Sequence, residues 1–166
     1  QLGADPLLVA CQLVQGLQSI VTRNINPLDS VVLSVTKIHC GDATNIIADE
    51  CVIEGTVRCF SEDVLKAVET RMGRISQDLC LAFDCEGQFD FRRAYPATIN
   101  HAAQANYMRE VAVNLLGQDK VVDFTPTMGS EDFSFFLQEK PGCYFALGNG
   151  DGDHRDLLHG MGPVSY

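Results

Sequence analysis

Two neighbouring acids, Glu131 and Asp132, follow a glycine turn and open a short amphipathic segment. Carboxylates in the first turn of a helix lie favourably against its positive end. Residues 141–150 come next, with the pattern of a Pro-Gly turn and a buried strand ending in glycines, where backbone can come close to a ligand. Binding and catalytic sites are commonly built from polar groups beside loops of this kind. The residues alone favour the plainer interpretation, a capped helix followed by a core strand.

Three other groups of residues could suggest chemistry, and each has a plainer interpretation. His39 and Cys40 are neighbours on a predicted strand, so they point to opposite faces and do not form a thiolate–imidazole pair. Residues 148–153 look like a calcium loop but lack the spacing and the closing Glu of an EF-hand, which favours a solvated turn. Arg58 lies on the polar face of a predicted strand, where a surface charge is the simplest explanation.

Composition limits the function classes. The 166 residues carry 12 basic and 22 acidic side chains, a net charge of −10. This balance argues against nucleic acid and anionic membranes as partners, because both require clustered Lys and Arg. Hydrophobic residues make up 46 %, enough for a packed core. The seven Cys are odd in number and include no Cys-x-x-Cys pair, so we expect small buried hydrophobes in a reducing cytoplasm rather than a disulfide framework.

The first half of the chain predicts five elements. Asp5-Pro6 starts an amphipathic helix, residues 31–38 form a strand, and residues 46–60 form a long strand or a bent pair. Ser61 caps a second helix, and strict alternation over residues 83–92 predicts another strand. One further strand before residue 1 would give β-α-β-β-α-β, an α+β ferredoxin-like unit whose first strand is missing here.

The second half has a different pattern, and we place a domain boundary near residues 95–100, with domains over residues 1–97 and 98–166. Residues 102–116 predict a helix capped by Gly117. Short strands are predicted at residues 121–124 and 143–147, with the acidic helix between them. Helices alternating with short apolar strands predict a partial α/β segment.

Four motifs in one order carry a family resemblance. They are "MGSEDFSFFL…PGCYFALGNG", "LGADPLLVACQLVQGLQSIVTRNINPLDSVVLSV", "IHCGDATNIIADECVIEGTVRCF" and "YPATINH". Together they resemble the zinc-type amidohydrolases of the aminoacylase/carboxypeptidase superfamily, in the branch of hippurate hydrolase and indole-acetyl-amino-acid hydrolase. The resemblance implies a lid and dimerisation domain followed by a truncated part of a catalytic domain. It also implies a homodimer formed through the lid.

The resemblance assigns substrate-binding roles to three residues. Asn45 of "GDATNII" and Arg58 of "GTVR" would reach from the lid toward an N-acyl amino acid. An Arg fork can hold the free carboxylate of such a substrate, and an Asn amide supplies oriented hydrogen bonds. Glu131 would belong to the cleft wall and orient a metal-bound His.

The implied chemistry needs two divalent metal ions, whether zinc, manganese, cobalt or nickel. The family's ligands, a Cys or Asp, two His and a Glu, and its general-base Glu are expected before residue 1. No metal ligand or catalytic residue is therefore assigned within the chain, and His159 of "HGMGP" is predicted not to be the last ligand. The chain alone is expected to be inactive. The alternative is a ferredoxin-like module for dimerisation or small-molecule regulation without catalysis.

Overall fold

The computed structural model describes residues 3–123 and 125–148. The chain divides into two compact units, Gln1–Arg92 and Arg93–Tyr166. This division falls shortly before the boundary predicted at residue 97. In the part of the chain that the structure describes, no helix is long and apolar enough to cross a membrane.

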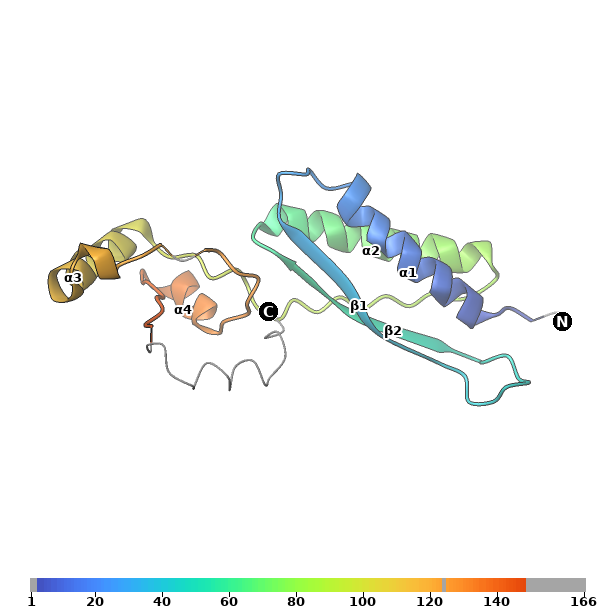
Figure 1. The fold of residues 1–166 in the computed structure, drawn as a ribbon. Helices are drawn as coiled ribbons and strands as arrows, with labels where there is room; N and C mark the ends of the chain where they lie inside the picture. Colours follow the sequence, from blue (N-terminus) through green and yellow to red (C-terminus); the bar gives the residue numbers. More distant parts are fainter. Residues whose placement is uncertain (1–2, 124, 149–166) are drawn as a thin grey trace. The chain divides into compact units, whose positions relative to one another are not determined.

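The first unit packs two helices on one face of a two-stranded sheet (Figure 1). The helices are α1 (Pro6–Arg23) and α2 (Glu62–Ala82), and the strands are β1 (Val31–Cys40) and β2 (Cys51–Cys59). Both predicted helix starts are confirmed. The Asp5 carboxylate accepts a hydrogen bond from the Leu7 N–H at 3.0 Å, and the Ser61 hydroxyl accepts one from the Val64 N–H at 3.4 Å. Apolar side chains from both helices and β1 form the core: Leu17, Ile20, Leu33 and Val68.

The sheet is an antiparallel ladder that runs from the pair Val31–Cys59 to the pair Cys40–Cys51. Its register shifts between Val35 and Lys37, where β1 carries one extra residue. Without this bulge, the period-two alternation would turn the second half of β1 to the opposite face. The bulge therefore decides which side chains of β1 face the helices.

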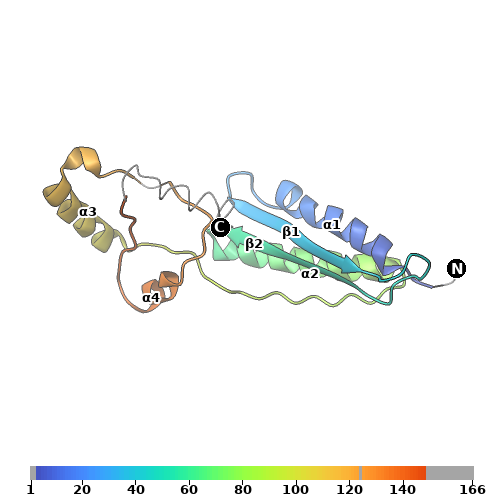
Figure 2. The same ribbon diagram turned by 60° about the horizontal axis from the view of Figure 1, so that its bottom comes forward.

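Two strand predictions in the first unit need correction. β2 begins at Cys51, and residues 41–50 form a loop, so a strand starting at residue 46 is wrong. Residues 85–91 are in no ladder, although their side chains alternate between half-buried and exposed as predicted. Figure 2 shows this segment running along α2, where the Phe89 ring lies against Gly73. Alternation reports which side chains face the helix, whereas a strand also requires a hydrogen-bonding neighbour.

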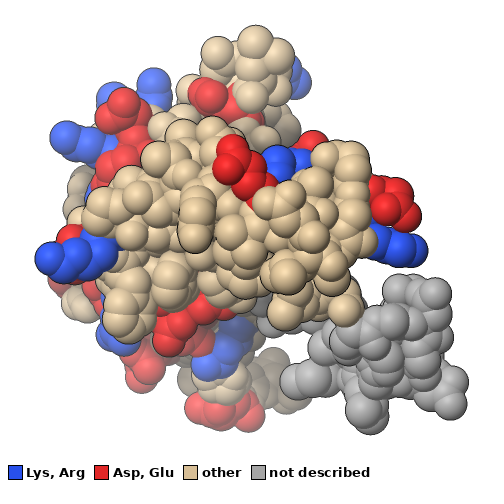
Figure 3. All heavy atoms as spheres, turned by 90° about the vertical axis from the view of Figure 1, so that its left-hand side faces the viewer, with Lys and Arg blue, Asp and Glu red and all other residues tan. Residues whose placement is uncertain are grey.

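The second unit contains α3 (Ala102–Leu116), the short 3₁₀ helix η1 (Gln118–Lys120) and α4 (Phe133–Glu139). α3 ends at Gly117, whose φ of +91° suits glycine, so this predicted helix and its cap are confirmed. Among the described residues, α3 buries no side chain. Figure 3 shows the face that carries α3, a broad uncharged surface with Lys, Arg, Asp and Glu around it.

The strands predicted at residues 121–124 and 143–147 are wrong for the described positions, which belong to no ladder. A side chain instead pairs with the backbone at Tyr144. The Asn100 amide oxygen accepts from the Tyr144 N–H at 2.7 Å, and the Asn100 amide nitrogen donates to the Tyr144 carbonyl at 2.8 Å. These two hydrogen bonds satisfy the groups that a neighbouring strand would have paired.

The expectation of buried cysteines is also wrong for most positions. Cys80 is buried, Cys11 is exposed, and the other five cysteines are half-buried. A sequence window shows whether neighbouring residues are apolar but not how much of a side chain its packing partners cover. All seven thiols are free.

Candidate functional site

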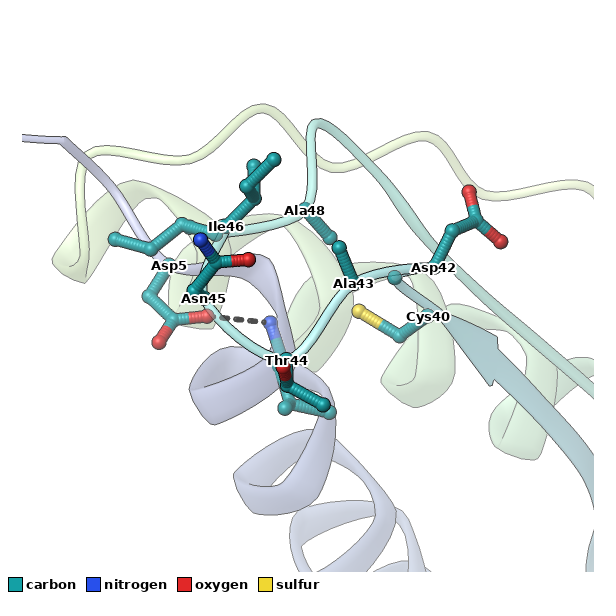
Figure 4. Close-up of a pocket in the computed structure, with 11 residues that line it drawn as sticks. Asp5, Cys40, Asp42, Ala43, Thr44, Asn45, Ile46 and Ala48 are labelled. Carbon is teal, nitrogen blue, oxygen red and sulfur yellow. Dashed lines mark hydrogen bonds between the residues drawn. The ribbon is translucent and has the colours of Figure 1, made fainter.

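The loop over residues 41–50 and the start of α1 enclose an open pocket of about 640 Å³ (Figure 4). Asn45 lies on this loop, and the labelled view shows its amide above the Asp5 carboxylate. Of the described residues that line the pocket, none is Lys, Arg or His, and two are Asp. The pocket therefore offers amide, hydroxyl, thiol and carboxylate groups but no positive charge for an anionic substrate.

Arg58 lies on β2 directly opposite Val32, on the sheet face away from the helices. Its neighbour in sequence, Val57, packs toward the core, which places the half-buried Arg58 side chain on the other face. Farther along the same face, Lys37 and Glu54 form a cross-strand ion pair. This outer sheet face is polar and holds the guanidinium group that the sequence assigned to carboxylate binding.

The fold does not bring Asn45 and Arg58 together within one chain. The Asn45 loop joins the strands at the Cys40–Cys51 end of the ladder, whereas Arg58 is one pair from the opposite end. Arg58 lies seven positions after Cys51, which is about 23 Å at the rise of an extended strand. The two predicted binding residues therefore belong to two different places on the first unit.

Glu131 is held at the start of α4 by hydrogen bonds to both carboxylate oxygens. Oε1 accepts from the Phe133 N–H at 3.3 Å, and Oε2 accepts from the Tyr144 hydroxyl at 2.9 Å. The Phe133 and Tyr144 rings pack with centroids 5.7 Å apart. The sequence placed Glu131 and Asp132 in the first helical turn, and the structure places them just before it, with Asp132 as the N-cap residue.

Hydrogen bonding sets the charge of this cluster. A hydrogen bond with the Asp132 carboxyl, followed by the Tyr144 and Phe133 donors, lowers the pKa of Glu131. The same bond to Glu131 raises the pKa of Asp132, because one proton shared by two carboxyls favours ionisation of only one. The hydrogen bond to Glu131 also raises the pKa of Tyr144. Glu131 is thus kept as the carboxylate, and Tyr144 is kept as a hydroxyl donor.

Asn100 and His101 hold the backbone that carries Tyr144, and sequence reasoning missed their role. The His101 Nδ1 accepts from the Gly142 N–H at 3.2 Å, and the His101 N–H donates to the Gly142 carbonyl at 3.1 Å. Both residues lie in the motif "YPATINH". Two adjacent polar residues just before a helix were a possible signal in the sequence. Gly142, the partner of His101, lies 41 positions away, so no local pattern indicates the contact.

The described residues do not fit a metal centre. They include no group of three or more His, Cys, Asp or Glu side chains that could hold a metal ion. His154, His159 and residues 149–153 of the predicted glycine-rich turn lie outside the described residues. Arg58, Asn45 and the Glu131 cluster offer charged and hydrogen-bonding groups, but they are not grouped as metal ligands.

Residues 9–160 match the family model described as Peptidase family M20/M25/M40. The chain belongs to this family. The resemblance to metal-dependent amidohydrolases is therefore confirmed at the level of the family. A solved structure of the Bacillus subtilis YXEP protein, described as a dinuclear metal binding peptidase of the family, matches this peptidase-family chain with a TM-score of 0.71. The identity is 28 %, over 84 % of this chain and 35 % of that one.

Two curated relatives of this peptidase-family chain are deacetylases. The N-acetyl-L-cysteine deacetylase of Bacillus subtilis (strain 168) is 38 % identical over 92 % of this chain and 36 % of its own length. The N-acetyldiaminopimelate deacetylase of Priestia megaterium is 38 % identical over 87 % of this chain and 38 % of its own length. The chain thus spans little more than a third of these relatives. Neither is named as a hippurate hydrolase.

Proposed function

We propose that this chain is part of a metal-dependent amidohydrolase that cleaves the amide bond of N-acyl amino acids. The observation that carries the proposal is the 38 % identity, over 92 % of the chain, to an enzyme that removes an acetyl group from the nitrogen of an amino acid. Substrates would include short acyl and hippurate-like conjugates. The enzyme would act in the cytoplasm on small molecules, not on nucleic acid or membranes.

In this proposal the first unit is the lid. The ferredoxin-like order has four strands, so β1 and β2 would be joined by one further strand and by residues 85–91. The alternating burial of residues 85–91 supports this arrangement, in which the further strand would be their pairing partner. The second unit would be a partial α/β segment of the catalytic domain, with Glu131 on the cleft wall. Two divalent metal ions are proposed because a structural relative is described as dinuclear. Their ligands would lie outside the described residues.

Arg58 is proposed as the anchor of the substrate carboxylate. Its guanidinium group stands on the outer sheet face, and an Arg fork can bind a carboxylate through two parallel hydrogen bonds. An N-acyl amino acid is far shorter than the distance between Arg58 and the Asn45 loop. Asn45 would therefore contact substrate held by another copy of the chain rather than the same molecule.

A homodimer through the lid is consistent with this arrangement. β1 has one ladder partner, β2, among the described residues, which leaves its other edge available for pairing. Exposed apolar side chains lie along this strand, including Val32 and Ile38. Light scattering on the full-length protein tests the dimer, and a monomeric mass at micromolar concentration would contradict it.

The decisive experiment uses the full-length enzyme with an N-acetyl amino acid and its carboxamide analogue. Arg58→Ala should lower kcat/KM for the free acid roughly thirtyfold, which corresponds to a loss of about 2 kcal/mol in transition-state stabilisation. It should hardly change kcat/KM for the carboxamide. Arg74→Ala is the matched control, because Arg74 is an exposed helix residue paired with Asp78. An equal loss on both substrates would show that Arg58 does not anchor the carboxylate.

Turnover measurements on the full-length protein also distinguish the amidohydrolase from the alternative, a ferredoxin-like module that dimerises or senses a small molecule. Turnover of N-acyl amino acids with zinc, manganese, cobalt or nickel supports the amidohydrolase. A full-length dimer with no turnover under any of these metals favours the module. The 166-residue chain alone should give no turnover of hippurate or N-acetyl amino acids above a metal-only control.

A further inference from the structure

Two cysteines face each other at the end of the β1–β2 ladder. Cys40 is the last residue of β1 and Cys51 is the first residue of β2, and they are direct register partners. Residues directly opposite in an antiparallel pair point to the same face of the sheet. The Cys40 side chain is close enough to raise the pKa of Cys51. Nothing in the amidohydrolase proposal uses this pair.

The register alone brings the two cysteines within disulfide distance. Opposite residues of an antiparallel ladder have Cα atoms about 4.5 or 5.5 Å apart, depending on whether the pair exchanges backbone hydrogen bonds. Disulfides span Cα separations of about 4.4–6.8 Å, so both arrangements fall within the range. Bond formation therefore requires side-chain rotation and little backbone movement.

The pair is also accessible. Cys40 lines the open pocket beside the Asn45 loop, and Figure 4 shows its sulfur directed toward the interior of that loop. Both thiols are half-buried rather than enclosed. The Cys40 thiol is 3.5 Å from the Glu50 carbonyl, which it can reach as a weak donor. A small disulfide in solution can approach this sulfur through the pocket.

We propose that Cys40 and Cys51 form a reversible disulfide that closes the loop over residues 41–50. The bond would restrain the loop that carries Asn45 and borders the pocket, because both ends of the loop would be covalently joined. The disulfide would thus be a redox-sensitive modification site of the proposed enzyme. Its formation can be tested without measuring catalytic activity.

The oxidant is a low-molecular-weight disulfide of the glutathione type. The Cys40 thiolate attacks one sulfur of this disulfide, forms a mixed disulfide and releases one glutathione thiolate. Cys51 then loses its proton and attacks the Cys40 sulfur, which breaks the mixed disulfide and releases the second glutathione. Two protein thiols are oxidised, one glutathione disulfide is reduced to two glutathiones, and the two thiol protons go to the released thiolates.

The order of attack follows from the surroundings of each sulfur. Partial burial and the neighbouring Cys40 thiol raise the pKa of Cys51 to about 11, so Cys51 keeps its proton at neutral pH. A protonated thiol is a poor nucleophile. The pocket-lining Cys40 is therefore the first to react, and Cys51 resolves the mixed disulfide.

Thiol mapping of the 166-residue chain tests the proposal. The protein is equilibrated with a series of reduced-to-oxidised glutathione ratios, quenched with acid, alkylated, digested and analysed by mass spectrometry. The peptide pair joined through Cys40 and Cys51 should increase toward the oxidising end and disappear with dithiothreitol. Hydrogen exchange at residues 41–50 should slow on the order of tenfold in the oxidised form.

Two variants make the result specific. In Cys40→Ser, Cys51 should remain in peptides without an intramolecular partner. Cys59→Ser is the matched control, because Cys59 lies on the same strand and the same face but pairs with Val31. It should leave the Cys40–Cys51 bond unchanged. Circular dichroism checks that both variants fold.

Three outcomes would overturn the inference. In the first, Cys51 links to Cys11, the third thiol in its electrostatic surroundings. In the second, Cys40 and Cys51 appear only as separate glutathione adducts at the most oxidising ratio. In the third, the bond forms but exchange over residues 41–50 is unchanged, which would refute the closure of the loop.

Discussion

Gly55 offers the sharpest test of the sheet that carries Arg58. It lies on β2 opposite Val35, at the position where β1 bulges. A Cβ placed there would overlap the Ser34 carbonyl oxygen and lie 3.1 Å from the Val35 Cα. Both contacts are with backbone, so no side chain can rotate away to make room. Gly55→Ala must therefore push β1 away from β2.

The expected cost comes from overpacking. Inserting a methyl group into a packed region typically costs about 1–3 kcal/mol, and rigid neighbours place a substitution at the upper end. We expect Gly55→Ala to lower the free energy of unfolding by about 3 kcal/mol. With a denaturant slope of about 2 kcal/mol per molar urea, the unfolding midpoint should fall by about 1.5 M.

The assay is urea unfolding of the full chain, followed by far-UV circular dichroism. Gly16→Ala is the matched control, because Gly16 lies inside α1 and its added Cβ would meet only an Ile75 methyl group at 3.4 Å. Alanine is favoured over glycine in a helix by about 1 kcal/mol, so this variant should be equal to the wild type or slightly more stable.

The same chemical substitution should thus destabilise the protein at Gly55 but not at Gly16. The reasoning is refuted if Gly55→Ala unfolds within about 0.5 kcal/mol of the wild type. It is also refuted if Gly16→Ala and Gly55→Ala lower the midpoint equally, since the loss would then not be specific to the contact with β1.

Three further predictions concern a cap, the core and the acidic cluster. Asp5→Ala should cost about 1 kcal/mol of stability in the same urea assay, because it removes the hydrogen bond to the Leu7 N–H; an unchanged midpoint would contradict this cap. Val68→Ala should cost about 2 kcal/mol because Val68 is fully buried, whereas Val122→Ala, at a position 80 % exposed, should change stability by less than about 0.5 kcal/mol. Hydrogen bonds lower the pKa of Glu131 below its ordinary value of 4.5, so the stability it contributes is complete above that pH and is lost as the pH falls through the folded-state pKa. Tyr144→Phe should move the Glu131 titration, followed by carboxyl NMR, back toward higher pH, and an unmoved midpoint would show that the Tyr144 hydroxyl does not hold this carboxylate.

Local signals in the sequence determined the helices and their starts. Asp5-Pro6 and Ser61 cap α1 and α2 as predicted, and Gly117 ends α3, because capping depends on residues within one turn of each other. The outward position of Arg58 also follows from alternation along one strand. The family itself could be recognised from ordered motifs, and its model matches residues 9–160.

The tertiary structure decided which distant residues meet. The bulge between Val35 and Lys37 sets the register that opposes Cys40 and Cys51, and no local pattern predicts that register. The ladder also separates Asn45 from Arg58, although the sequence assigned both to one substrate. Tyr144 meets Glu131, and Asn100 holds the Tyr144 backbone from 44 positions away. A strand-like pattern over residues 83–92 describes side-chain burial, but pairing requires a neighbour, and the neighbour is a property of the fold.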